Sequence, residues 1–193
     1  MAQTLSGTTL RLEPLTELHR EPLRFAAQDE RIWEFGIASG LGSAFDSWFD
    51  DALRGQNVGT RIPFVVVKTC DSKVVGSSSF LDPSPIHRRV EIGHTWYHPS
   101  EWGSSVNPEC KYLLIGHAFE SLGMNRVSFN VDRTNLRSQK AVLKLGAVQE
   151  GILRQHAITY TGRVRDTVVF SISKDELPSI RERLQKRLAR PST

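Results

Sequence analysis

Cysteine is scarce in this sequence, where Cys70 and Cys110 are the only two among 193 residues. Two widely separated thiols do not make a disulfide framework or a cysteine-rich metal site, so we expect both to be buried and reduced. The sequence also lacks an apolar run long enough to cross a bilayer, and its polar start, Met1 to Gly7, lacks the basic and apolar regions of a signal peptide. Together these absences predict a cytoplasmic protein without a metal site or membrane association.

Net charge is low as well. Of the net charge of +4, the last twenty residues supply +3, with six basic and three acidic side chains. They include an expected amphipathic basic helix at about 175–189, whose apolar stripe would pack on its own domain or on a second copy in a homodimer. Its basic face, with Arg181, Arg183, Arg187 and Arg190, could contact nucleic acid. A solvated face is the commoner use of such a pattern, so we expect no nucleic-acid partner.

What the sequence does contain is ordinary for a globular protein: 39% apolar and 24% charged residues, and a length that suits one domain over 1–193. Changes in hydrophobic period mark the elements. We expect a strand at 9–13, helices at 15–28 and 44–53, strands at 62–67, 73–81 and 89–97, a helix at 108–122, a strand at 126–131, a helix at 136–145, and strands at 147–153 and 167–172. This order predicts one mixed α/β domain, with a parallel crossover only around helix 108–122.

The most informative segment lies between strand 89–97 and helix 108–122. It consists of small and polar residues around one aromatic side chain: Trp102, Gly103, Ser104, Ser105, Val106 and Asn107. A turn of small residues that opens a helix leaves backbone N–H groups unpaired, and with the helix dipole these groups form an anion site sized for a phosphate or pyrophosphate. An ordinary helix start fits the same residues equally well.

Four segments in the same order resemble the GNAT superfamily of acyl-CoA N-acyltransferases, in particular its RimJ/RimL-like branch. They are Glu91-Ile92-Gly93-His94-Thr95-Trp96-Tyr97, the loop from Trp102 to Glu109, Asn135-Leu136-Arg137-Ser138-Gln139-Lys140-Ala141, and Leu145-Gly146-Ala147. The resemblance covers nearly the whole chain. It implies a central, mostly antiparallel sheet with a splayed parallel pair and helices on both faces. It also implies transfer of an acetyl group from acetyl-CoA, as co-substrate, to a primary amine by direct attack.

The resemblance also assigns residues to the cofactor. The superfamily's pyrophosphate signature, Q/R-x-x-G-x-G/A, is kept only loosely, because Ser105 stands at the first glycine position and Asn107 at the last. The pantetheine arm is expected to pair with backbone groups of the preceding strand, and the start of helix 136–145 is expected to hydrogen-bond the cofactor. The residues in these roles are Trp96, Tyr97, His98, Asn135 and Ser138. Asn135 is an equally good helix N-cap.

For catalysis, Glu91 stands at the strand position where many family members have an acid, and burial could raise its pKa toward neutrality. An ion pair with Arg88 or Arg89 is the structural alternative. Where the family often has a tyrosine that protonates the departing thiolate, this chain has Val142. Ser138, Tyr97, Tyr160 or water are the replacements that we consider, with Ser138 as the catalytic candidate. His94 is expected to be a hydrogen-bonded core residue.

The acceptor side is expected to lie at the loop 29–42 and the segment 154–165, with Trp33, Phe35 and Tyr160 as candidate substrate-binding residues, although large aromatic side chains are often simply core. The acceptor would be a protein N-terminus or a small amine. A second hypothesis is a non-catalytic acyl-CoA-binding or protein-interaction module on the same fold, because Ser105 and Val142 depart from the family pattern.

Overall fold

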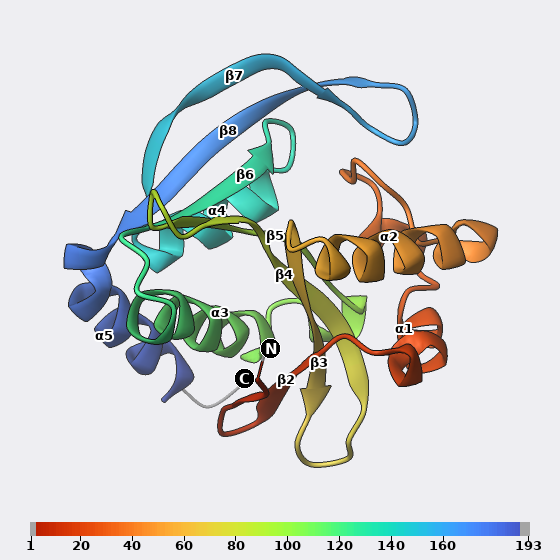
Figure 1. Cartoon of the computed structure of the whole chain (residues 1–193), viewed down its shortest axis with the longest axis horizontal. Helices are drawn as coiled ribbons and strands as arrows, with labels where there is room; N and C mark the ends of the chain where they lie inside the picture. The colour runs from red at the N-terminus through yellow and green to blue at the C-terminus, as the bar shows by residue number, and fades with distance from the viewer. Residues whose placement is uncertain (1–2, 190–193) are drawn as a thin grey trace.

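The protein, seen here as a computed structural model, is described over residues 3–189; residues 1–2 and 190–193, Arg190 included, lie outside the description. One eight-stranded sheet runs through the molecule in the order β1-β2-β3-β4-β5-β6-β8-β7 (Figure 1). The strands are β1 Leu5–Ser6, β2 Leu10–Pro14, β3 Arg61–Lys68, β4 Val74–Ser84, β5 Arg89–Tyr97, β6 Arg126–Asp132, β7 Val148–Ile158 and β8 Val164–Ser173.

Five α-helices cover the two faces of this sheet (Figure 1). They are α1 Arg20–Ala26, α2 Phe45–Asn57, α3 Val106–Gly116, α4 Leu136–Leu145 and α5 Leu177–Leu188. Buried side chains of α1 and α2 form one hydrophobic cluster with Val65 and Val67 of β3. Buried side chains of α3, α4 and α5 form a second cluster with the opposite face, including Phe64 and Val66. Alternate β3 residues therefore serve two separate cores, as the period of a strand requires.

The only parallel pair in the described sheet is β5 with β6, joined through α3 as the crossover. The two strands pair only from Arg89 to Glu91 with Arg126 to Ser128, and their remaining lengths diverge. This confirms the expected fold class: a mostly antiparallel mixed sheet with a splayed parallel pair and helices on both faces.

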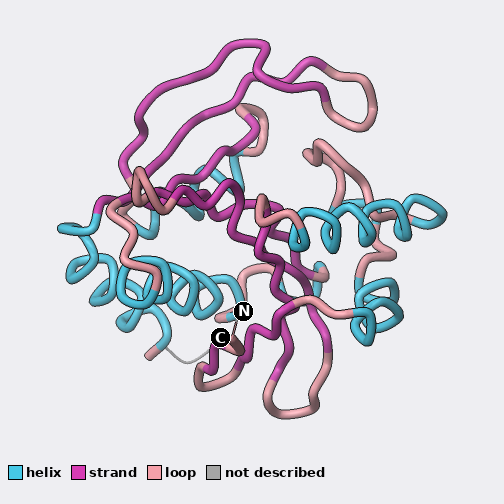
Figure 2. The backbone as a smooth tube through the Cα atoms, viewed as in Figure 1, coloured by secondary structure: helices cyan, strands magenta, loops and turns pink. Residues whose placement is uncertain are grey.

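Several expected element boundaries are wrong. Helix 108–122 begins earlier, at Val106, and after Gly116 continues as a π-helical turn, His117–Ser121. The expected strands 147–153 and 167–172 are too short, because β7 and β8 extend into the segment between them as a long hairpin (Figure 2). Cys110 is buried as expected, whereas Cys70 is exposed in the turn between β3 and β4.

The amphipathic C-terminal helix is present but shorter than 175–189: a 3-10 turn, Lys174–Glu176, precedes α5. Ile180 and Leu184 are buried in the cluster that α3 and α4 share, so the apolar stripe packs on its own domain. In the part of the chain that the structure describes, no helix is long and apolar enough to cross a membrane.

Asp132 closes β6 and fixes the start of α4. Its side chain is 1% exposed; Oδ1 accepts hydrogen bonds from the Thr134 backbone N–H at 2.8 Å and hydroxyl at 2.7 Å. Oδ2 accepts a hydrogen bond from Arg163 and lies 4.0 Å from the buried Arg165. Burial alone would raise the pKa of Asp132, but the hydrogen bonds from Arg163 and Thr134 outweigh it and lower that pKa.

Replacing Asp132 with asparagine should lower the free energy of unfolding by about 3 kcal/mol, because a buried arginine loses its counter-charge. For a domain of this size that corresponds to a fall in Tm of about 6–12 °C. The depressed pKa means that this stabilisation is full above the unfolded pKa of about 3.9 and is lost as the pH falls through the folded value. Calorimetric unfolding at neutral and acid pH measures both effects.

Asp166→Asn is the control, because Asp166 forms an ion pair with the exposed Arg133. This variant should change Tm little. Equal falls in Tm for the two variants would contradict this account.

Candidate active site

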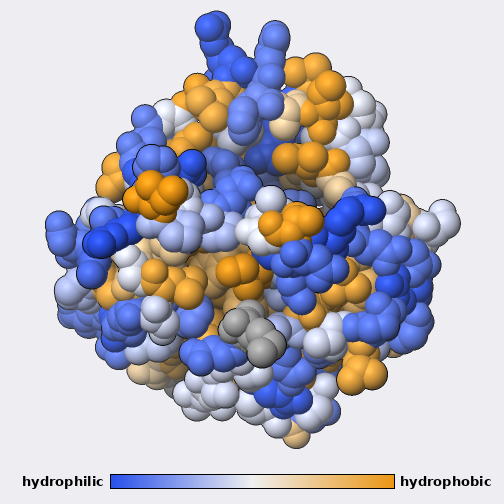
Figure 3. Space-filling model, in the orientation of Figure 1, coloured by the Kyte–Doolittle hydropathy of each residue, from blue (hydrophilic) through white to orange (hydrophobic). Residues whose placement is uncertain are grey.

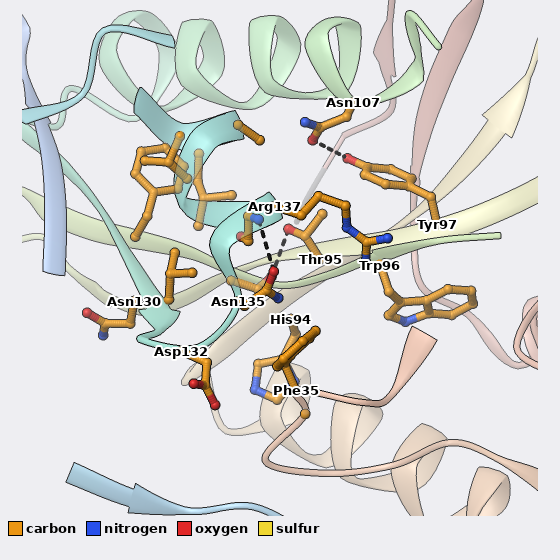
Figure 4. A pocket seen from close by; sticks show the side chains of 18 of the residues that line it. Phe35, His94, Thr95, Trp96, Tyr97, Asn107, Asn130, Asp132, Asn135 and Arg137 are labelled. Atoms are coloured by element: carbon orange, nitrogen blue, oxygen red, sulfur yellow. Dashed lines mark hydrogen bonds between the residues drawn. The ribbon is translucent and has the colours of Figure 1, made fainter. Parts of the chain in front are cut away.

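A cavity of about 920 Å³ opens where β5 and β6 separate. Many of the residues expected from the sequence line it, and Figure 4 labels five of them around this space: Phe35, Trp96, Tyr97, Asn107 and Asn135. The lining includes Trp33, Phe35, Glu91, Trp96, Tyr97, Trp102, Gly103, Ser104, Asn107, Asn135 and Ser138. Four expected residues do not line it: His98, Ser105, Val106 and Tyr160. Of these, Ser105 and Val106 line a smaller hollow with Ser104, toward β2.

A bulge in β5 sets which side chains face the cavity. The pairing with β4 shifts between Trp96 and Gly93, and His94 within that step has a φ of +47°. Such a bulge inserts a residue, bends the strand and re-aims its side chains. After it, Thr95 points to the α3 side, where it bonds Ser78 and Lys111, while Trp96 joins the aromatic cluster on the α1–α2 side.

Glu91 lies before the bulge, between Val90 and Ile92, whose side chains are buried on the α3 side. By strand alternation Glu91 therefore faces the α1–α2 side. Its Oε2 accepts a hydrogen bond from Asn130 Nδ2 of β6 at 2.6 Å. Burial, with a smaller contribution from the Asp82 carboxylate, raises the pKa of Glu91 to about 7. The alternative ion pair with Arg88 or Arg89 does not form among the described residues, so Glu91 is a half-buried carboxyl group poised near neutrality.

His94 is not the hydrogen-bonded core residue that we expected. Its side chain is exposed at the wall of the cavity and has no hydrogen bond among residues 3–189 (Figure 4). Desolvation, helped by the charges of Arg61 and Arg165, lowers the pKa of His94 to about 4. The expectation was wrong because the bulge interrupts the alternation of inward and outward side chains along β5 and turns His94 toward the cavity.

Three tryptophans build the wall on the α1–α2 side. The ring centroids of Trp33, Trp48 and Trp96 lie 5.4–5.8 Å apart. Each is at most 7% exposed, so these rings are mainly core, while the half-buried Phe35 contributes to the cavity lining beside them (Figure 4). Tyr160 does not line the cavity; it is 47% exposed on the β7–β8 hairpin, where its backbone N–H donates to the carbonyl of the cavity-lining Gly36 at 3.4 Å. Two other residues of the expected acceptor segment 154–165, His156 and Arg165, do line the cavity.

The loop after β5 has the geometry of a tight turn into a helix. Gly103 has a φ of +85°, which favours glycine, and the Ser104 hydroxyl accepts a hydrogen bond from the Val106 N–H at 3.2 Å. The Trp102 indole N–H donates to the Tyr97 carbonyl at 3.1 Å, and the Tyr97 hydroxyl donates to Asn107 Oδ1 at 3.2 Å. One helix N–H and one strand carbonyl are therefore already paired within the protein.

At the other side of the cavity, Asn135 caps α4, because its Oδ1 accepts from the Ser138 N–H at 2.9 Å. This leaves the Asn135 amide NH₂ as the group that can face a ligand. The Arg137 guanidinium lies 3.5 Å from the Trp102 ring centroid, so a cation–π contact joins α4 to the loop. Val142 is buried at the cavity wall, so the side chain at that position cannot donate a proton to the departing thiolate.

The sequence analysis missed Lys111 of α3. Its side chain lines the cavity although the residue is only 5% exposed, and Nζ donates to Thr95 Oγ1 at 2.9 Å and to Ser78 Oγ at 3.4 Å. Burial lowers the pKa of Lys111 to about 8, against a smaller opposite effect of Cys110. The missed signal was helical spacing, because Lys111 lies one turn before the buried Ile115 and next to the buried Cys110.

Basic side chains gather on the α4 and α5 side of the cavity. Arg137, Lys140, Lys144 and Arg187 all line it, and none forms a salt bridge within residues 3–189. The Arg187 Nη1 atom is buried without a hydrogen-bond partner in that range. Across the described chain, no three histidine, cysteine, aspartate or glutamate side chains come close enough to hold a metal ion.

A splayed sheet, a glycine-containing loop at a helix start and a cavity between them together define an acyl-CoA-type N-acyltransferase fold. The chain belongs to the GNAT acetyltransferase family, since its residues 9–148 match the acetyltransferase (GNAT) domain. This confirms the resemblance drawn from the sequence.

Individual proteins with similar sequences or structures support this family assignment. The chain is 32% identical over 102 residues to the uncharacterized N-acetyltransferase YoaA of Bacillus subtilis (strain 168), covering 53% of this chain and 56% of YoaA, just over half of its length. A GCN5-related N-acetyltransferase from Brucella melitensis superposes with a TM-score of 0.89 at 27% identity, covering 97% of this chain and 86% of that one. RimJ of Mycobacterium smegmatis, solved with CoA-disulfide, gives a TM-score of 0.82 at 19% identity over 96% and 94% of the two chains, which shows a shared fold.

Proposed function

We propose that this protein is a RimJ/RimL-like N-acetyltransferase that moves the acetyl group of acetyl-CoA to a primary amine by direct attack. The observation that carries the proposal is one cavity lined both by Trp102, Gly103, Ser104 and Asn107 of the helix-opening loop and by Glu91, a carboxyl group with a pKa of about 7. A cofactor held by its phosphates at the loop would present its thioester toward Glu91. The RimJ relative, which was solved with CoA-disulfide, supports the same cofactor class.

The residues present fit such a cofactor. Backbone N–H groups at the start of α3 favour anions, and the four unpaired basic side chains of α4 and α5 add positive charge around the cavity. The buried, unpartnered Nη1 of Arg187 is a further donor that a phosphate oxygen would satisfy. The Asn135 amide and the Ser138 hydroxyl are the neutral donors beside them.

In the proposed reaction Glu91, ionised, accepts a proton from the acceptor ammonium, and the neutral amine attacks the thioester carbonyl carbon. Backbone N–H groups freed by the β5 bulge stabilise the oxyanion. The nitrogen of the adduct releases its second proton to water, the C–S bond breaks with its electron pair going to sulfur, and the thiolate takes up a proton. No enzyme nucleophile is needed. Burial raises the pKa of the Cys110 thiol, which makes it a poor nucleophile.

Thiol release tests the proposal directly. Purified protein with acetyl-CoA and a panel of amines, including peptide N-termini, amino sugars and polyamines, should release free thiol at a rate proportional to enzyme. Mass spectrometry of the amine should show one added acetyl group. Binding of acetyl-CoA without thiol release for any amine would overturn the enzymatic proposal in favour of a non-catalytic acyl-CoA-binding module.

The acceptor is proposed to be a cationic amine, either a protein N-terminus or a small molecule. The cavity is lined by the carboxyl groups of Asp82 and Glu91 and by the edges of the tryptophan cluster, groups that attract an ammonium ion. Two cysteines without a disulfide fit the cytoplasmic location that we propose.

A homodimer is also proposed, through the β7–β8 hairpin. β7 is the outermost strand of the described sheet and exposes Ile152, Leu153 and Ile158. Figure 3 shows apolar groups among polar ones at the top of the molecule, where the hairpin lies. An unpaired edge with apolar side chains is a site for association. Light scattering should give twice the chain mass of 21.7 kDa, and Ile152→Lys should return the monomer mass; a wild-type monomer at all concentrations would contradict the proposal.

A further inference from the structure

Lys111 is the least expected group in the cavity. It stands on the inward row of α3 with Asn107 and Ile115, and its ammonium is enclosed by the Thr95 and Ser78 hydroxyls and the Phe129 ring, whose centroid lies 5.9 Å from Nζ. A lysine is almost never fully buried without a charged partner, because desolvation of the ammonium costs several kcal/mol. An apolar residue at this position would make the fold more stable, so stability does not explain why the residue is a lysine.

The position of Lys111 relative to Glu91 suggests a functional reason for the lysine. Glu91 faces the α1–α2 side of β5, whereas Lys111 contacts Thr95 on the α3 side, beyond the bulge. Both line the same cavity, at the place where β5 and β6 diverge. A carboxyl group and an ammonium group thus approach the gap in the sheet from opposite faces, the base from one side and the proton donor from the other.

We propose that Lys111 is the general acid, donating a proton from its ammonium to the sulfur of the departing thiolate, with Thr95 and Ser78 as the residues that position it. This rests on the proposed acyl transfer and supplies the acid that Val142 does not provide. As the C–S bond breaks, its electron pair goes to sulfur, an Nζ–H bond breaks, and an S–H bond forms. Lys111 is left as a neutral amine, and its proton returns from solvent.

The surroundings of Lys111 suit this role. On α3 the neighbouring Cys110 is a neutral buried thiol and Glu109 is turned away, bonded to the Thr9 N–H at 2.8 Å. None of the acidic groups that line the cavity forms an ion pair with Lys111 in the described chain: Asp82, Glu91, Glu101 and Asp132. The lining charges of α4 and α5 are positive: Arg137, Lys140, Lys144 and Arg187. These positive charges, like burial, disfavour the protonated form of Lys111.

Because burial lowers the pKa of Lys111 to about 8, the ammonium is mostly protonated at neutral pH and matched to a thiol pKa of about 8.5. The wild-type kcat should therefore fall above about pH 8 as Lys111 loses its proton. A lysine that merely fills space would not produce this basic limb.

The test compares Lys111→Met with the wild type in the thiol-release assay. We expect kcat to fall about a hundredfold, the basic limb near pH 8 to disappear, and the acetyl-CoA Kd to stay within about threefold of the wild type. Tm should be unchanged or higher, since a buried unpaired charge is removed. Lys174→Met, at an exposed lysine outside the cavity, is the matched control and should behave as the wild type.

A second donor separates proton donation from other roles. With p-nitrophenyl acetate, whose leaving group needs no proton, Lys111→Met should approach the wild-type rate, whereas with acetyl-CoA it should not. Wild-type thiol release with an amine tests the proposed function, and the ratio of the variant to the wild type tests Lys111 alone. A Lys111→Met enzyme with a kcat within about threefold of the wild type and an unchanged basic limb would overturn the assignment.

Discussion

Replacing Glu91 with glutamine should lower kcat by well over tenfold, about a hundredfold for loss of a general base, while the Kd for acetyl-CoA stays unchanged. Glutamine keeps the size and the hydrogen-bonding capacity toward Asn130 but cannot accept a proton. Glu91 lies on β5 before the bulge, whereas the loop 102–107 follows the end of that strand, so in the proposed arrangement cofactor binding does not depend on the charge of Glu91. Thiol release and calorimetric titration measure the two quantities on the same preparation.

The pH dependence has a defined sign. Glu91 must be ionised to act as a base, and burial raises its pKa to about 7, so kcat should rise with pH through about 7 and level off above it. The Glu91→Gln variant should lack this acid limb. Asp82→Asn removes a neighbouring negative charge that raises the same pKa and should shift the limb to lower pH. Retention of full activity and of the limb in Glu91→Gln would show that another group takes the proton.

Replacing Ser105 with glutamate should weaken acetyl-CoA binding strongly. Ser105 stands at the N-cap position of α3, in the loop proposed to hold the pyrophosphate, and a new carboxylate there would repel the phosphates by about 2 kcal/mol after screening, a rise in Kd of about thirtyfold. The same acid lies at the positive end of the helix dipole, so Tm should stay constant or rise. A loss of binding without a loss of stability is therefore the expected result.

Ser105→Gln is the matched control, because it has the same size as the glutamate variant and no charge. Its Kd should stay close to that of the wild type, and the difference between the two variants should shrink as salt is raised. Equal binding by all three proteins would show that the phosphates do not lie at this loop.

Most of the fold and part of the site could be predicted from the sequence. Strand β3 and helix α3 carry strong local patterns, so the crossover was placed correctly along the chain, and the loop from Trp102 to Asn107 leads into α3 as expected. Glu91 was identified by its position in the strand and the family resemblance. These features depend on residues that are close together in the sequence, so the hydrophobic period and local motifs are enough to predict them.

The remainder depends on contacts that no local pattern encodes. The bulge at His94 exists only in the register between β4 and β5, and it determines that His94 faces the cavity. In the sequence, Lys111 looks like an ordinary exposed lysine on a helix. Its burial becomes apparent only from the packing of α3 against β5, where Lys111 contacts Thr95. The lengths of β7 and β8 were underestimated because these strands continue through a segment whose exposed residues have no strand-like alternation of burial.

The most direct test of the central claim is a calorimetric titration of acetyl-CoA, and separately of CoA, into the wild-type protein, followed by addition of the amine panel to the same sample. The account predicts saturable one-to-one binding of both ligands, weakened in Ser105→Glu, and thiol release once an accepted amine is present. An absence of binding for both ligands would contradict it, because the loop 102–107 and the basic side chains of α4 and α5 would then have no phosphate to hold.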